Sequence, residues 1–168
     1  MPCQDGTQKQ QNSSIIGSLE VPDTSTAQHT PGSTQQSQVQ PHRSASILLV
    51  EDDQALATLE AGMLAAQGFK VTAVQSGELA IMEIQKALPQ LVILDLELAG
   101  EISGWEVLQR LRAETIVPVL LTTSAATTVR ASIRMYHESK RTLDHLPKPY
   151  LMQTFLRRVK RMLPIAPM

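Results

Sequence analysis

The sequence predicts an α/β fold, a doubly wound sandwich in which helices cover both faces of a five-stranded parallel sheet. From residue 46 onward, short runs of aliphatic residues alternate with stretches in which apolar residues recur at helical spacing. The aliphatic runs are continuous and do not alternate with polar residues. This pattern is typical of strands that are buried on both faces, as in a parallel sheet covered by helices.

The first two strand–helix units precede Pro89. Ile47–Val50 is predicted as a buried strand, and the helix after it ends at Gly68 with apolar positions Leu56, Leu59, Met63 and Leu64. Lys70–Val74 is a second strand, and we expect it nearer an edge of the sheet because it is less apolar. The next helix runs from about Gly77 to Ala87, with apolar positions Leu79, Ile81, Met82 and Ile84.

Three more units complete the pattern. Leu91–Leu94 is a third buried strand, and the helix after it has apolar positions Trp105, Val107, Leu108 and Leu111. Val117–Leu121 is a fourth strand, followed by a helix from about Ala126 to Tyr136. A short strand ends at Leu146, and the last helix runs from about Leu151 to Leu163, with inward positions Leu151, Phe155, Leu156, Val159 and Leu163.

The N-terminal segment has a different composition. Of the first 44 residues, 28 are Gly, Pro, Ser, Thr or Gln, and none is aromatic. Such a segment has little apolar surface to bury against the entropy cost of ordering. We therefore predict a disordered tail over residues 1–45, a folded domain over 46–163 and a short C-terminal tail over 164–168.

Charge and cysteine content exclude several classes of protein. The formal net charge of −1 gives no global reason to expect direct binding to nucleic acid or to an anionic membrane. The single cysteine, Cys3, excludes a disulfide or a cysteine-based metal site within one chain. No apolar run approaches the roughly 18 residues of a membrane span, and the N-terminus lacks the features of a signal peptide. We expect a cytoplasmic protein.

Polar residues gather where the predicted strands end. The first strand ends in Glu51-Asp52-Asp53, the third in Asp95 and the fourth in Thr122-Thr123-Ser124, while the fifth leads into Lys148-Pro149. In a doubly wound fold, sites form at the carboxyl ends of the strands. We therefore expect these carboxylates, a hydroxyl and an ammonium to lie near one another.

This combination suits phosphoryl transfer. Clustered carboxylates repel one another unless a cation neutralises them, and Mg²⁺ accepts carboxylate oxygens together with a phosphate oxygen. Asp95 could then act as a nucleophile toward phosphorus. Thr123 and Lys148 could stabilise the charge on the transferred group.

Each residue also has an ordinary structural interpretation. Asp53 could only cap the helix that begins near Gln54. An aspartate such as Asp95 at a strand end is often a turn residue, and Thr or Ser after a strand commonly caps the next helix. The whole set, in order along one α/β pattern, is much harder to obtain by chance than any one member.

Over about residues 46–163 the sequence resembles the receiver domain family of response regulators in two-component signalling. The matching stretches are Ile47–Asp53, Leu91–Leu96, Gly104–Leu108, Pro118–Thr123 and Leu146–Tyr150. The resemblance implies a flavodoxin-like sandwich. It also implies a phosphoprotein that catalyses its own phosphorylation and dephosphorylation but is not an enzyme acting on a separate substrate.

The resemblance assigns a role to each site residue. Asp95 matches the phosphoacceptor, Thr123 the switch hydroxyl and Lys148 the lysine that contacts the phosphoryl group. The ligands implied for Mg²⁺ are Asp52 directly, Glu51 through water, Asp95, and the backbone carbonyl of Glu97.

The expected function is that of a single-domain response regulator in a Mg²⁺-dependent phosphorelay. A histidine kinase or a phosphotransfer domain would donate the phosphoryl group to Asp95, and a downstream protein partner would receive the signal. The alternative is an interaction module with the receiver fold that phosphorylation does not switch. Two further alternatives fit the sequence less well. A phosphatase with an aspartyl nucleophile would place that residue on the first strand, whereas Asp95 follows the third. A flavin-binding protein is disfavoured because the acidic run after the first strand would repel the flavin phosphate.

Several positions depart from the family pattern. Ala99 stands where a proline is usual, and Gly104 lies nine residues after Asp95 instead of eight. His145 occupies the place of a common aromatic switch residue. It could be a rotating switch group or an ordinary histidine in a strand. We predict that the basic residues of the last helix, Arg157, Arg158, Lys160 and Arg161, form a solvated face, with partner docking as the alternative.

Overall fold

The computed structural model describes residues 44–163. Both predicted tails lie outside these residues, apart from Ser44 and Ala45. The strands are β1 (Ser46–Val50), β2 (Lys70–Val74), β3 (Leu91–Asp95), β4 (Val119–Thr123) and β5 (Leu143–Pro147). The helices are α1 (Gln54–Ala66), α2 (Gly77–Lys86), α3 (Gly104–Glu114), α4 (Ala126–Arg134) and α5 (Met152–Met162).

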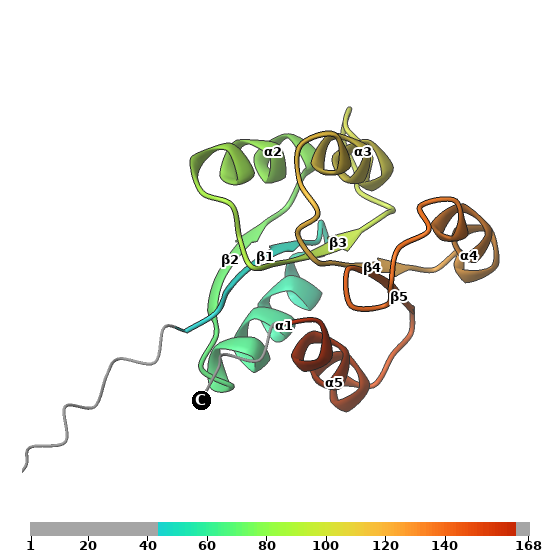
Figure 1. Ribbon diagram of the computed structural model, residues 1–168. Helices are drawn as coiled ribbons and strands as arrows, with labels where there is room; N and C mark the ends of the chain where they lie inside the picture. Colours follow the sequence, from blue (N-terminus) through green and yellow to red (C-terminus); the bar gives the residue numbers. More distant parts are fainter. Residues whose placement is uncertain (1–43, 164–168) are drawn as a thin grey trace, which may run out of the picture. The chain divides into compact units, whose positions relative to one another are not determined.

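The five strands form one parallel sheet in the order β2-β1-β3-β4-β5. Helices α1 and α5 lie on one face of the sheet, while α2, α3 and α4 lie on the other (Figure 1). The predicted doubly wound five-stranded parallel sheet is confirmed, and β2 is an edge strand as expected. Within residues 44–163, no helix combines the length and the apolar character that crossing a membrane requires.

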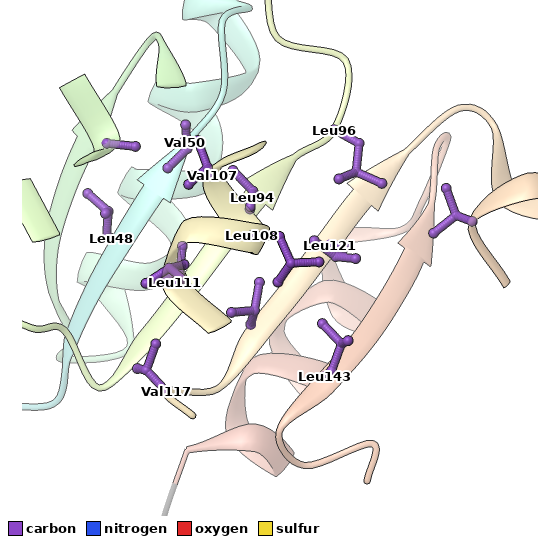
Figure 2. Packing of buried hydrophobic residues seen from close by; sticks show 14 residues of the cluster. Leu48, Val50, Leu94, Leu96, Val107, Leu108, Leu111, Val117, Leu121 and Leu143 are labelled. Carbon is purple, nitrogen blue, oxygen red and sulfur yellow. The ribbon is translucent and has the colours of Figure 1, made fainter. Parts of the chain in front are cut away.

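Strands β1, β3 and β4 are buried on both faces because each separates two apolar layers. In β1, Leu48 and Val50 belong to the cluster beneath α2 and α3, whereas Ile47 and Leu49 belong to the cluster beneath α1 and α5. Figure 2 shows the first cluster, where Val107, Leu108 and Leu111 of α3 lie over the strands. The continuous aliphatic runs of the sequence are the result of this two-sided burial.

The predicted apolar faces of the helices are partly wrong. Leu59, Leu79 and Met82 are 51%, 45% and 52% exposed, although all three were expected to face the core. Leu64 of α1 is buried as predicted, and the other buried positions are Ala57 and Glu60 in α1 and Gly77 and Ala80 in α2. The small residues Ala57, Gly77 and Ala80 allow the helices to lie close to the sheet, which turns some larger neighbours toward solvent.

Two predicted boundaries also shift. The fourth strand ends at Thr123, two residues later than expected, so that both threonines belong to β4. Leu151, expected to face inward, is 74% exposed and is the N-cap residue of α5. A residue at this position precedes the first helical turn, so its side chain does not follow the periodicity of the helix.

Candidate functional site

The carboxyl ends of β1, β3 and β5 bring four charged side chains together, and we call Glu51, Asp52, Asp95 and Lys148 the acidic edge. Val50 pairs with Leu94 across β1 and β3, which places the acids that follow each strand side by side. One carboxylate oxygen from each of the three acids lies within 4.8 Å of the others. Glu51 and Asp95 are buried and Asp52 is half-buried.

Lys148 bridges two of these acids. Its Nζ lies 2.6 Å from Asp95 Oδ2 and 2.8 Å from Glu51 Oε2. Burial by itself would lower the pKa of Lys148, but the hydrogen bonds to Asp95 and Glu51 outweigh it and raise that pKa. Burial raises the pKa of Glu51 in spite of the bond from Lys148, and the charge of Asp95 adds to this effect.

The acidic edge has more negative than positive charge. Three carboxylates face one ammonium, so a further cation would stabilise the site. All the free ligand atoms offered by the acids are oxygens, which are the ligands preferred by hard cations such as Mg²⁺. The acidic edge therefore fits the predicted metal.

The loop after β3 is held to the acidic edge by its backbone. Glu97 N donates to Asp95 Oδ1 at 3.0 Å, and Ala99 N donates to Asp52 Oδ2 at 3.0 Å. These bonds fix the direction of both carboxylates and keep the loop close to the site. Ala99 supplies here the backbone donor that the usual proline would lack.

Gly104 lets α3 begin directly against the strand that ends in Asp95. A Cβ atom on Gly104 would lie 2.1 Å from the carbonyl oxygen of Asp95 and 2.6 Å from Leu96 Cα. The unusual loop before Gly104 is tied to α2, because Ile102 N donates to Glu78 Oε1 at 2.9 Å. The additional residue is therefore accommodated in the loop, and Asp95 keeps its place beside Glu51.

Thr123 is buried at the end of β4, and its hydroxyl contacts Glu97. Thr123 Oγ1 donates to Glu97 Oε1 at 3.2 Å and accepts a bond from Ala125 N at 2.9 Å. The carboxylate of Glu97 also accepts from Ser124 N at 2.9 Å. Burial would raise the pKa of Glu97, but these hydrogen bonds, with Ser124 foremost, lower it.

The side chain of Glu97 is a site feature that the sequence did not indicate. The sequence predicted only a role for the backbone carbonyl of Glu97 toward the metal. The structure shows that the carboxylate joins the β3–α3 loop to the start of α4, where Ala125, the N-cap residue, has no side-chain cap of its own. This contact spans 26 residues and follows no local sequence pattern.

A second group of charges surrounds α4 and β5, and we call it the α4–β5 side. Its members are Arg112, Arg130, Glu138, Asp144, His145, Arg158 and Arg161. Arg112 Nε lies 2.5 Å from Glu138 Oε1, and the buried carboxylate of Asp144 accepts hydrogen bonds from Arg158 and Arg161. Arg157, Lys160 and Arg161 are exposed and Arg158 is half-buried, in agreement with the predicted solvated face, but Arg158 and Arg161 are also paired with an acid of β5.

His145 is partly buried in β5 and is held by α4. Its Nε2 accepts a hydrogen bond from Arg130 Nε at 3.2 Å, and an imidazole nitrogen that accepts a bond carries no proton. Burial lowers the pKa of His145, which favours this neutral form. A groove of about 770 Å³ lies beside it, lined by Arg130, Arg134, Lys140, Leu143 and Arg158 among others. Rotation of His145 stays a prediction.

Comparison with known proteins identifies a family and several relatives of this chain. The family described as the response regulator receiver domain matches residues 47–160. The sensory transduction protein RegX3 of Mycobacterium tuberculosis is 33% identical over 118 residues, which is 70% of this chain and 50% of RegX3. The DNA-binding response regulator MtrA of Mycobacterium leprae is 31% identical over 114 residues, covering 68% of this chain and 49% of MtrA.

A solved structure is similar over the same region. The putative response regulator from Chloroflexus aurantiacus superposes with a TM-score of 0.62 at 28% identity, covering 71% of this chain and 98% of that one. The chain spans about half the length of the curated relatives it matches.

Proposed function

The chain belongs to the response regulator receiver domain family, and we propose that it accepts a phosphoryl group on Asp95 from a histidine kinase or a phosphotransfer domain. The observation that supports this most strongly is the position of Lys148, whose ammonium lies 2.6 Å from Asp95 Oδ2. The ammonium thus lies directly beside the carboxylate that acts as the nucleophile. It also lies where the oxygens of an incoming phosphoryl group would carry negative charge.

The transfer is a displacement at phosphorus. One carboxylate oxygen of Asp95 forms a bond to phosphorus, and the bond from phosphorus to the donor's imidazole nitrogen breaks with its electrons remaining on nitrogen. Lys148 stabilises the oxygens of the transferred group. Asp52, Asp95, the backbone carbonyl of Glu97 and, through water, Glu51 would hold Mg²⁺. When bound, this ion supplies positive charge to the same oxygens.

Thr123 connects this chemistry to α4. In the present structure its hydroxyl donates to Glu97, which in turn accepts from the backbone at the start of α4. A phosphoryl oxygen on Asp95 would compete for the Thr123 hydroxyl, because a charged acceptor forms a stronger hydrogen bond. Loss of the Thr123–Glu97 contact would alter the beginning of α4 and so the surface offered to a downstream protein partner.

Intact-protein mass spectrometry after incubation with acetyl phosphate and Mg²⁺ tests the proposal. We expect one added phosphoryl group in the wild-type protein, and none in Asp95→Asn or in the presence of EDTA. Asp53→Asn is the matched control. Asp53 caps α1 through bonds from Ala55 N and Leu56 N, so this variant should still be phosphorylated. A folded wild-type protein that gains no mass, also with a histidine phosphodonor, would favour the unswitched interaction module.

A further inference from the structure

Glu60 lies in the middle of α1, on the face that packs against the sheet, and it is 0% exposed. Its neighbours on that face are Ala57 and Leu64. Glutamate is rarely buried to this extent, because a carboxylate in an apolar environment costs free energy unless it is paired and hydrogen-bonded. The phosphoryl transfer described above makes no use of this side chain.

The partner of Glu60 is Tyr150, in the segment that joins β5 to α5. The Tyr150 hydroxyl donates a hydrogen bond to Glu60 Oε1. Within residues 44–163, Glu60 Oε2 has no hydrogen-bond partner. Burial raises the pKa of Glu60 to about 7, although the bond from Tyr150 acts in the opposite direction. The carboxyl group therefore changes its charge near neutral pH.

Tyr150 connects this carboxyl group to the acidic edge. Only Pro149 separates Tyr150 from Lys148 in the sequence. The ring of Tyr150 stacks on Phe155 of α5, with 5.8 Å between the ring centroids and 10° between the ring planes. The ring is thus held by α5 and the hydroxyl by α1. Holding Tyr150 in this way restricts where the Lys148 ammonium can lie relative to Asp95.

We propose that Glu60, acting through the hydroxyl of Tyr150, is a positioning residue for Lys148. Neutral Glu60 holds the Lys148–Tyr150 segment so that the ammonium lies between Asp95 and Glu51. Ionised Glu60 adds a negative charge close to this group and opposes the approach of an anionic phosphodonor. Besides Tyr150, the groups whose charges reach Glu60 are Glu51, Asp95 and Lys148.

The inference rests on the proposed function, because it concerns the rate at which Asp95 is phosphorylated. It requires that this rate falls as the pH rises through 7, the region in which Glu60 ionises. The same change in pH also acts on the phosphodonor and on other groups. The contribution of Glu60 is therefore measured as a difference in the pH dependence of the phosphorylation rate. The two proteins compared are the wild type and a variant that cannot ionise at this position.

The test is the initial rate of phosphorylation by acetyl phosphate at saturating Mg²⁺ between pH 6 and pH 8, followed by intact mass. Glu60→Gln keeps the size and the acceptor oxygen but cannot ionise. Glu60→Leu/Tyr150→Phe replaces both polar groups with apolar ones, which avoids an unpaired partner. Glu114→Gln, at the opposite end of α3 from Gly104, is the matched control.

We expect the wild-type rate to fall about threefold more than that of Glu60→Gln over this pH range, and Glu114→Gln to follow the wild type. The double variant should be about tenfold slower at every pH, since it no longer holds the Lys148–Tyr150 segment. A wild-type pH profile in Glu60→Gln would overturn the inference, even if the double variant does not fold. No phosphorylation of the wild type at any pH, by acetyl phosphate or by a histidine phosphodonor, would overturn the proposed function as well.

Discussion

The acidic edge and the α4–β5 side have opposite charge balances. At the acidic edge three carboxylates share a single ammonium. At the α4–β5 side, Glu138 and Asp144 are each paired with an arginine, and Asp144 contacts two of them. The groove beside these pairs has the further cations Arg130, Arg134 and Lys140 in its lining.

The difference in charge balance separates a site with unneutralised negative charge from a surface whose acids are already neutralised. An excess of buried negative charge favours a bound cation and makes the acidic edge sensitive to a phosphoryl group. Paired acids surrounded by additional cations are already neutralised, and such a surface can favour an acidic partner through its electrostatic potential.

The largest effect is expected at Arg112, which is only 9% exposed and whose guanidinium contacts Glu138 and the carbonyl oxygens of Val117 and Thr142. Removing one partner of a buried ion pair costs about 3–5 kcal/mol. Arg112→Ala should lower the free energy of unfolding in urea by about this amount. The exposed Arg110→Ala is the control and should change it by less than about 0.5 kcal/mol. Equal effects would show that the ion pairs of the α4–β5 side do not support the fold.

The second prediction concerns the pH dependence of stability at Glu60. Its pKa rises from 4.5 to about 7 on folding, so the folded protein keeps a proton that the unfolded chain loses. This contribution is fully present below pH 4.5 and is lost as the pH rises through 7, which is worth about 3 kcal/mol. The free energy of unfolding of Glu60→Gln minus that of the wild type should therefore be larger at pH 8 than at pH 5 by about this amount. An unchanged difference between the two pH values in urea unfolding would contradict the assignment.

The smallest effects on stability are expected from substitutions at Gly104 and Gly62. Gly104→Ala places a Cβ atom against the backbone of Asp95, and overpacking of this kind costs about 2 kcal/mol. It should also slow phosphorylation, because the strand end that holds Asp95 must move. Gly62→Ala lies in α1 with nothing within 4 Å and should stabilise the protein by about 0.5–1 kcal/mol. Thermal unfolding of both variants measures the two changes in stability. Changes of the same sign in the two variants would contradict the prediction.

The sequence predicted the fold and the position of the acidic edge because both follow from local patterns. Continuous aliphatic runs indicate a covered parallel sheet, and the residue after each run then lies at one edge of it. The sequence did not predict that Glu60 faces the core, since a helical face is assigned from its apolar residues and Leu59 is the more apolar neighbour. Contacts such as Arg112–Glu138 and Thr123–Glu97 join residues 26 apart, and only the folded chain brings them together.

Borohydride trapping can show whether Asp95 is the phosphoacceptor. Borohydride reduces an aspartyl phosphate to homoserine, which peptide mass spectrometry can locate in the sequence. After incubation with acetyl phosphate and Mg²⁺, we expect reduction at residue 95, with Asp52 and Asp53 unchanged. Reduction at Asp52 or Asp53, with Asp95 intact, would contradict it.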